Sequence, residues 1–181
     1  MRNWEWGRLA YLCNLSDATW KLGGPVEAIA YTPDGRYFAT ADRAGKVILW
    51  DWQSRKPIHE FSHGQYIHSV AFDPSGERFA SGSSDRTIHV YRVSDGKLTQ
   101  KLVGHIDGVT SVRFNANGQK LLSCSFDKTA IIWDLDTGMP IQHLKGHAWW
   151  VWSAEFSPDN QRIVTAGQDG KAIVWQKLND D

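Results

Sequence analysis

One segment of the chain recurs at a fixed distance, and this repetition restricts the available folds more than any other feature. Leu102–Asp134 aligns without a gap on Leu144–Gln176, which lies 42 residues further along. Phe61–Arg92 falls in the same frame one period earlier, and Gly24–Asp51 precedes it one residue closer. Units of this length cannot bury an apolar face alone, so we expect the four copies to stack on one another.

Within each copy, short alternating runs are separated by turn sequences at the spacing of tight hairpins. The turn sequences are Pro33–Gly35, Pro74–Gly76, Asn117–Gly118 and Pro158–Asn160. The third copy predicts strands near Val109–Phe114, Gln119–Ser123, Thr129–Asp134 and Pro140–Lys145. We therefore expect an all-β fold of four-stranded antiparallel units. A short helix is predicted only at residues 3–13, within an N-terminal extension of residues 1–16.

Charge and cysteine content exclude several classes of function. Lys plus Arg and Asp plus Glu total 20 each, so no net charge attracts nucleic acid or an anionic membrane surface. No apolar run reaches membrane-spanning length. Cys13 and Cys124 cannot form a disulfide framework or a paired zinc motif, which favours a reducing, cytoplasmic location.

The copies share a Gly-His start, a Pro-containing turn, an Asp between the second and third strands and a closing Trp-Asp. In these features residues 22–176 resemble the WD-repeat β-propeller family, and the period matches its ~40–45-residue blades. The resemblance implies a propeller domain over residues 17–181 with four WD-type blades, at about 22–60, 61–101, 102–143 and 144–181. The segments RNWEWGRLAYLC and HAWWVWSAEFSPD also resemble WD-repeat regions of large bacterial proteins that carry serine/threonine kinase domains.

His105, Ser123 and Asp127 imitate a hydrolase triad, because a base, a nucleophile and a carboxylate come close together in sequence. The same set recurs in two other copies, always with 22 residues from His to Asp, whereas an enzyme needs one site. The resemblance implies instead that each set is a buried structural tetrad closed by an aromatic residue. We therefore predict no catalytic residues. The tetrad residues are His63, Ser81 and Asp85; His105, Ser123, Asp127 and Trp133; and His147, Thr165, Asp169 and Trp175.

The tetrads are unequal between copies. Tyr91 stands in the tryptophan position of the second copy. In the first copy Leu22 and Ala44 replace the His and the Asp, which leaves Thr40 and Trp50 and predicts the loosest or most specialised blade. His59 and His63 lie four residues apart, but His63 belongs to a tetrad, so neither a metal nor a cofactor is expected.

The resemblance places partner contacts three and five residues after each His and directly before each Asp. The resulting positions are Tyr66, His68, Ser84, Gly108, Thr110, Phe126, Trp150, Trp152 and Gln168, with Pro25, Glu27 and Arg43 from an alignment of the first copy on Tyr31. Two interpretations of Trp150 and Trp152 stay open. They form an exposed aromatic patch with Tyr66 and Phe126, or they fill gaps between blades.

The number of blades also leaves alternatives. The fourth copy reaches Gln176 without a fourth strand, and Asp17–Leu22 is a candidate for the strand it lacks. We expect a partial propeller of a longer protein; the alternatives are a homodimer that forms an eight-bladed ring by exchanging this strand, and a four-bladed ring. The predicted function is a non-catalytic scaffold that binds a protein or peptide. The alternative is a regulatory or ligand-sensing module of a larger bacterial signalling enzyme.

Overall fold

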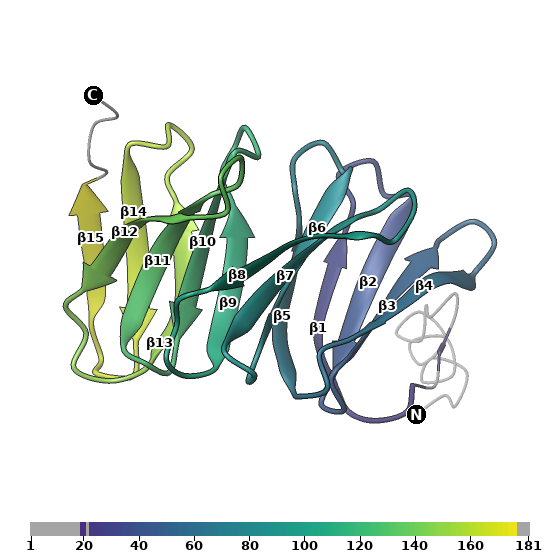
Figure 1. The fold of residues 1–181 in the computed structure, drawn as a ribbon, viewed down its shortest axis with the longest axis horizontal. Coiled ribbons are helices and arrows are strands. Elements are labelled where there is room, and N and C mark those ends of the chain that lie inside the picture. The colour runs from purple at the N-terminus through teal and green to yellow at the C-terminus, as the bar shows by residue number, and fades with distance from the viewer. Residues whose placement is uncertain (1–18, 21, 177–181) are drawn as a thin grey trace, which may run out of the picture.

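The computed structural model describes residues 19–20 and 22–176, and these residues form strands, turns and loops without a helix. The predicted all-β fold is confirmed, while the helix expected at residues 3–13 lies outside the described residues. Three sheets have four strands in sequential antiparallel order, and the fourth has three (Figure 1). We call these sheets blades 1 to 4.

The strand boundaries follow the repeat. Blade 1 contains β1 (Val26–Tyr31), β2 (Tyr37–Asp42), β3 (Lys46–Asp51) and β4 (Lys56–Ser62). Blade 2 contains β5 (Ile67–Phe72), β6 (Arg78–Ser83), β7 (Thr87–Arg92) and β8 (Leu98–Val103). Blade 3 contains β9 (Val109–Phe114), β10 (Lys120–Ser125), β11 (Thr129–Asp134) and β12 (Pro140–Lys145). Blade 4 contains β13 (Val151–Phe156), β14 (Arg162–Gly167) and β15 (Ala172–Gln176).

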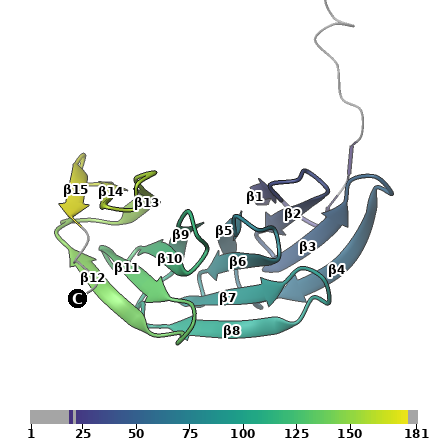
Figure 2. The same ribbon diagram turned by 90° about the horizontal axis from the view of Figure 1, so that it is seen from above.

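The blades stand side by side in an open arc. Figure 2 shows the first strand of each blade on the concave side and β4, β8 and β12 on the convex side. The described residues form an arc that does not close on itself, which fits a partial propeller or half of a larger ring and argues against a four-bladed ring. Asp17–Leu22 was a candidate for the missing outer strand of blade 4. Among the described residues of this segment, Trp20 packs on blade 1, against Phe38 and Trp50, and so does not complete blade 4 of its own chain.

Apolar side chains fill the junction between each pair of blades. Alternate residues of a strand point to opposite faces of the sheet. Leu122 and Ile132 of blade 3 therefore pack on Val151 and Ala154 of blade 4, while Leu121 and Trp133 face blade 2. Each inner blade thus has a front face toward the preceding blade and a back face toward the following one. This stacking buries the apolar surface that a single repeat cannot cover alone.

Candidate functional site

Blade 3 holds a buried chain of four polar side chains. His105 Nδ1 lies 2.8 Å from Asp127 Oδ2, and His105 Nε2 lies 2.8 Å from Ser123 Oγ. Trp133 Nε1 donates a 2.8 Å hydrogen bond to the same Ser123 oxygen. Ser123 is completely buried, so its hydroxyl is engaged on both sides and closed to a substrate. The triad-like set in blade 3 therefore satisfies buried polar groups, which are costly when unpaired.

Blade 4 repeats this geometry. His147 Nδ1 lies 2.9 Å from Asp169 Oδ1, and His147 Nε2 lies 2.8 Å from Thr165 Oγ1, which also accepts a 2.9 Å hydrogen bond from Trp175 Nε1. The glycine before each His has a steric reason. A Cβ on Gly104 would lie 2.7 Å from the Trp133 ring, and one on Gly146 would lie 2.8 Å from the Trp175 ring.

The carboxylates of these two networks are held in the charged form. Burial raises the pKa of Asp127, but hydrogen bonds from His105 and Thr129 outweigh burial and lower the pKa to about 2. The backbone N–H of Ala148 is the main cause that lowers the pKa of Asp169 to about 2. Both carboxylates therefore act as permanent acceptors at neutral pH.

Blade 2 has a different network. His63 Nε2 lies 2.7 Å from Ser81 Oγ, but His63 Nδ1 lies 3.3 Å from Asp85 Oδ2. Tyr91 does not reach Ser81; its hydroxyl lies 3.0 Å from Nδ1 of His89, a residue with no predicted role. The His89 ring stacks on the His63 ring with centroids 3.8 Å apart. Blade 2 thus fills the tryptophan position with a Tyr91–His89 pair.

His63, Asp85 and His89 form the one group of three metal-ligand side chains found in the described part of the chain. The two imidazole planes are within 17° of parallel, whereas the nitrogen lone pairs lie in those planes and have to converge on one ion. Both nitrogens of His63 are already in hydrogen-bonding contact. This arrangement fits a polar network better than a metal centre.

Blade 1 keeps the remainder of a tetrad. Trp50 Nε1 donates a 3.0 Å hydrogen bond to Thr40 Oγ1, as the tryptophans of blades 3 and 4 do to their hydroxyl residues. Aromatic packing surrounds this pair, since Trp50 stacks on Phe38 at 6.0 Å and Trp20 lies 6.3 Å from Trp52. The expectation that blade 1 is the loosest or most specialised stays a prediction.

The predicted contact residues lie in the loops before each first strand, at the second residue of each first strand, and in the loops between each second and third strand. These loops form the lower edge of Figure 1. We call this edge the loop face. Arg43 lies over the Tyr66 ring at 5.3 Å, and Tyr66 lies 4.3 Å from His68. His68 in turn meets Phe126 of blade 3 edge-on at 5.2 Å. One line of ring contacts therefore links blades 1, 2 and 3.

This line continues into blade 4. Phe126 meets Trp150 at 4.9 Å and Trp152 at 5.6 Å, and the two tryptophans lie 5.7 Å apart at 87°. Trp150 is 38% exposed and Trp152 is 46% exposed. Both earlier interpretations of the tryptophans hold in part, because they contact blade 3 and still present surface to solvent. We call the continuous series from Arg43 to Trp152 the aromatic ladder.

The ladder is fixed at its other end by charge and hydrogen bonds. Arg43 forms an ion pair with Glu27, and this contact lowers the pKa of Glu27. His68 Nε2 lies 2.8 Å from Ser84 Oγ, and burial lowers the pKa of His68, which favours the neutral ring. Pro25 and Gln168 are exposed at the two ends of the same face.

Thr110 requires a correction. It is only 8% exposed, and its hydroxyl donates a hydrogen bond to the Val151 carbonyl of blade 4. Gly108 is buried as well, with space for a Cβ limited by Ser84 and Phe126. These two predicted contact residues join blades and are not available to a partner.

Sequence reasoning missed two features of the loop face. Trp149 is 57% exposed, and the Lys128 ammonium lies 5.7 Å from its ring centroid. Lys128 has a left-handed backbone, with φ of 73°. Ile106, in the loop before β9, is exposed as well. The run of tryptophans in HAWWVW was the available signal for Trp149, since the repeat frame selected only its neighbours.

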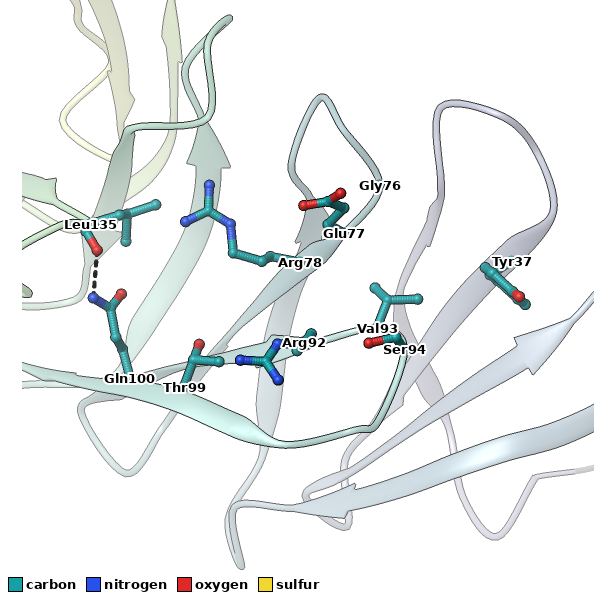
Figure 3. Close-up of a pocket in the computed structure, with 10 residues that line it drawn as sticks. All are labelled: Tyr37, Gly76, Glu77, Arg78, Arg92, Val93, Ser94, Thr99, Gln100 and Leu135. Carbon is teal, nitrogen blue, oxygen red and sulfur yellow. Dashed lines mark hydrogen bonds between the residues drawn. The ribbon is translucent and has the colours of Figure 1, made fainter.

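A cavity of about 610 Å³ opens away from the loop face, between the turns of blade 2 and blade 3 (Figure 3). Its arginines are occupied. Arg78 pairs with Asp73 at 3.1 Å and donates to the Gly118 carbonyl at 2.6 Å, and Arg92 pairs with Asp95 at 2.9 Å. Gln100 Nε2 donates to the Leu135 carbonyl across the cavity. The bonds to Gly118 and Leu135 join blade 2 to blade 3, and the ion pairs within blade 2 leave little charge for a ligand.

Comparison with known proteins agrees with this geometry. Residues 17–51, 55–92, 96–134 and 138–176 match the family described as WD domain, G-beta repeat. The chain belongs to the WD-repeat family. The second, third and fourth matches begin just before the outer strands β4, β8 and β12 of the preceding blades, so a WD repeat and a blade are offset along the chain.

Among similar WD-repeat proteins is an uncharacterised one from Schizosaccharomyces pombe, 34% identical over 49% of this chain and 15% of its own length. Actin-interacting protein 1 of Drosophila melanogaster is 32% identical over 43% of this chain and 13% of its own. Small ribosomal subunit protein RACK1z of Oryza sativa is 30% identical over 50% of this chain and 25% of its own. The matches thus span a quarter or less of each relative. Within the described residues, no helix is long and apolar enough to cross a bilayer.

Proposed function

We propose that this WD-repeat chain is a non-catalytic scaffold that binds a protein or peptide across its loop face. The aromatic ladder carries the proposal. It offers Trp150, Trp152 and Tyr66 together with Arg43, the residue types enriched at interface hot spots. The ladder is held in place by contacts between blades, so binding would require little reorganisation.

The two ends of the loop face differ in chemistry. Blade 1 presents the Arg43–Glu27 ion pair, and blade 4 presents the exposed rings of Trp149, Trp150 and Trp152. An extended segment with apolar or aromatic anchors at one end and charged residues at the other would match this order. The ladder is thus the surface on which we expect affinity to concentrate.

The proposal is tested with peptides selected on the wild-type chain from a displayed random library. Trp150→Ala is compared with Trp52→Ala, because both tryptophans are 38% exposed and Trp52 lies in the turn after β3, away from the loop face. Loss of one hot-spot ring is expected to weaken peptide binding about tenfold or more. The Trp52 variant is expected to bind as the wild type does. Equal loss in both variants, or no loss in Trp150→Ala, contradicts the proposal.

The scaffold assignment includes the absence of turnover and a cytoplasmic location. Its support is that the triad-like sets are enclosed hydrogen-bonded networks and that Cys124 is a free, buried thiol. A regulatory module of a bacterial signalling enzyme rests on resemblance alone, and the relatives above come from fission yeast, fly and rice.

The open arc adds a second part to the proposal. A propeller face is larger when more blades continue it, and closure also removes unpaired strand edges. We propose that further blades complete this arc, supplied by a second copy of the chain or by a longer protein.

A further inference from the structure

No described residue covers the back face of blade 4. Four residues on the back face of blade 3 pack against blade 4: Leu122, Cys124, Ala130 and Ile132. Their counterparts 42 positions later are Val164, Ala166, Ala172 and Val174. The four counterparts are exposed, and Val174 reaches 63%. The pattern that fills an internal junction is therefore present here without an opposing blade.

Blade 1 has the matching uncovered front face. Ile67, Val70 and Phe72 of blade 2 pack against blade 1, and their counterparts 41 positions earlier are Val26, Ile29 and Tyr31. These three are exposed, and Ile29 reaches 67%. The two ends of the arc thus carry the two halves of one internal junction.

Trp20 packs against blade 1 at the position where a preceding blade would lie. Phe61, in the outer strand of blade 1, packs on blade 2 at 5.2 Å from Phe79 and 4.4 Å from Tyr91. Trp20 lies 5.4 Å from Phe38 and 5.9 Å from Trp50, and each of these three residues is 41 positions before its counterpart. Trp20 therefore takes the place that the outer strand of a preceding blade would occupy.

Blade 4 is the blade that needs such a strand. Its described part has three strands, and the edge of β15 has no paired neighbour. In blade 1, Phe61 pairs with Val47, whose counterpart in blade 4 is Ala172. The repeat frame therefore places Trp20 of one copy opposite Ala172 of the copy that precedes it.

We propose that two copies of this chain associate head to tail into a closed ring of eight blades. The back face of blade 4 of each copy packs on the front face of blade 1 of the other, and Trp20 takes the outer-strand position of the partner's fourth sheet. The inference rests on the open-arc part of the proposed function and commits it to a second copy. The ring would also make the loop face continuous from one copy to the other. Within the chain, the residue directly before the position of the tetrad Asp contacts the next blade, as Arg43 contacts Tyr66 and Phe126 contacts Trp150.

By the same rule, Gln168 of one copy would adjoin Pro25 of the other. Eight blades lie within the four to eight that propellers use. Two identical junctions related by a two-fold axis also close without leaving an end for further growth. A blade 4 to blade 4 contact would leave Val26, Ile29 and Tyr31 uncovered.

The test measures mass by light scattering over a dilution series of the full chain. The wild type is expected at twice 20.5 kDa. Val174→Glu and Ile29→Lys each bury two unpaired charges per dimer and are expected to weaken association at least about a hundredfold. Both positions are exposed in the single chain, so neither substitution should impair folding. Val103→Glu is the matched control, because Val103 is 65% exposed on the outer strand β8.

Mixing the two variants distinguishes the arrangement. A Val174→Glu chain with an Ile29→Lys chain has one unaltered junction and one junction with opposite charges, so the mixture is expected to regain the dimer mass. A wild type with the mass of one chain overturns the inference. Three other results also overturn it: a wild-type mass that keeps rising with concentration, an Ile29→Lys chain that stays dimeric, and a mixture of the two variants that stays monomeric. Peptide binding to the loop face is measured separately, so a monomer that binds peptide refutes the ring and leaves the scaffold standing.

Discussion

Blades 2 and 3 answer the same packing problem with different side chains. In blade 3 the Trp133 indole reaches Ser123, and Gly104 leaves room for the ring. In blade 2 Tyr91 is too short to make that bond, and Ser62 stands where Gly104 does. His89 occupies the position of Ile131, pairs with the Tyr91 hydroxyl and stacks on His63.

The difference shows how much freedom the fold allows behind a fixed strand arrangement. Both blades keep the His–hydroxyl contact, at 2.7 Å in blade 2 and 2.8 Å in blade 3. Blade 2 weakens the contact to the carboxylate and leaves the buried His89 Nε2 without a partner among the described residues. We therefore expect the polar network of blade 2 to contribute less to stability than that of blade 3.

The largest effect is expected for the carboxylates. Asp127 accepts from His105, from Ile106 N and twice from Thr129. Asp85 likewise accepts twice from Thr87, but it has no counterpart of the Ile106 bond, because Gly64 N donates to Ser62 Oγ, and it lies farther from its His. Asp127→Ala should lower the free energy of unfolding by about 3 kcal/mol, because it strands several buried donors. Asp85→Ala should cost at least about 1 kcal/mol less. Urea denaturation of both variants measures the gap, and equal losses would show that the two networks are equivalent.

The second prediction concerns the pH dependence of stability, which is expected to differ between the networks of blades 2 and 3. Burial lowers the pKa of His63 and lowers that of His89 to about 4, so the unfolded chain binds more protons than the folded chain between about pH 6.5 and 4. Stability should therefore fall as pH drops through this window. Asp127, with its pKa lowered to about 2, contributes stability that is lost only below about pH 4.

His89→Ile tests the assignment of the upper window. The urea midpoint of the wild type is expected to drop between pH 7 and pH 5 by an amount equivalent to about 1–2 kcal/mol. The variant should lose much of this drop while keeping the decline below pH 4. An unchanged drop in the variant would place the proton uptake on other groups.

The smallest effect concerns the coupling between the two replaced residues. His89→Ile alone leaves the Tyr91 hydroxyl without its contact, and Tyr91→Trp alone leaves His89 Nδ1 without one. The double variant has the residues of blade 3 at these two positions, while Ser62 crowds the new indole equally in the single and the double variant. It should therefore be about 1 kcal/mol more stable than the sum of the single changes. A double-mutant cycle at pH 7 measures this coupling, and strict additivity would mean that the pair does not act as a unit.

The repeat predicted the fold because its alternation and turns are local and occur four times. Even so, β10 runs from Lys120 to Ser125, beyond the predicted end at Ser123, since Ser125 still pairs with Val109. The packing of Trp20 was not predicted, although Trp20 lies one repeat before Phe61. It depends on contacts with Phe38 and Trp50, which the alternation within a strand does not encode.

The site was predicted less completely. The repeat frame selected Tyr66, His68, Phe126, Trp150 and Trp152, which the structure brings together in the ladder. It also selected Thr110, whose burial results from a hydrogen bond to the next blade. The role of His89 was not predicted, because the other three copies have isoleucine at this position and the comparison of the repeats therefore assigns it no polar contact.

Lys128 has a consequence for how the loop face is to be altered. Its φ of 73° lies in the left-handed region, where a residue with a Cβ is disfavoured by about 1–2 kcal/mol and glycine is not. Blades 1 and 4 have Gly45 and Gly170 at the corresponding turn. Lys128→Gly would therefore relax the backbone and also remove the cation beside Trp149. The expected result is a chain that is more stable but binds a partner less well at the loop face.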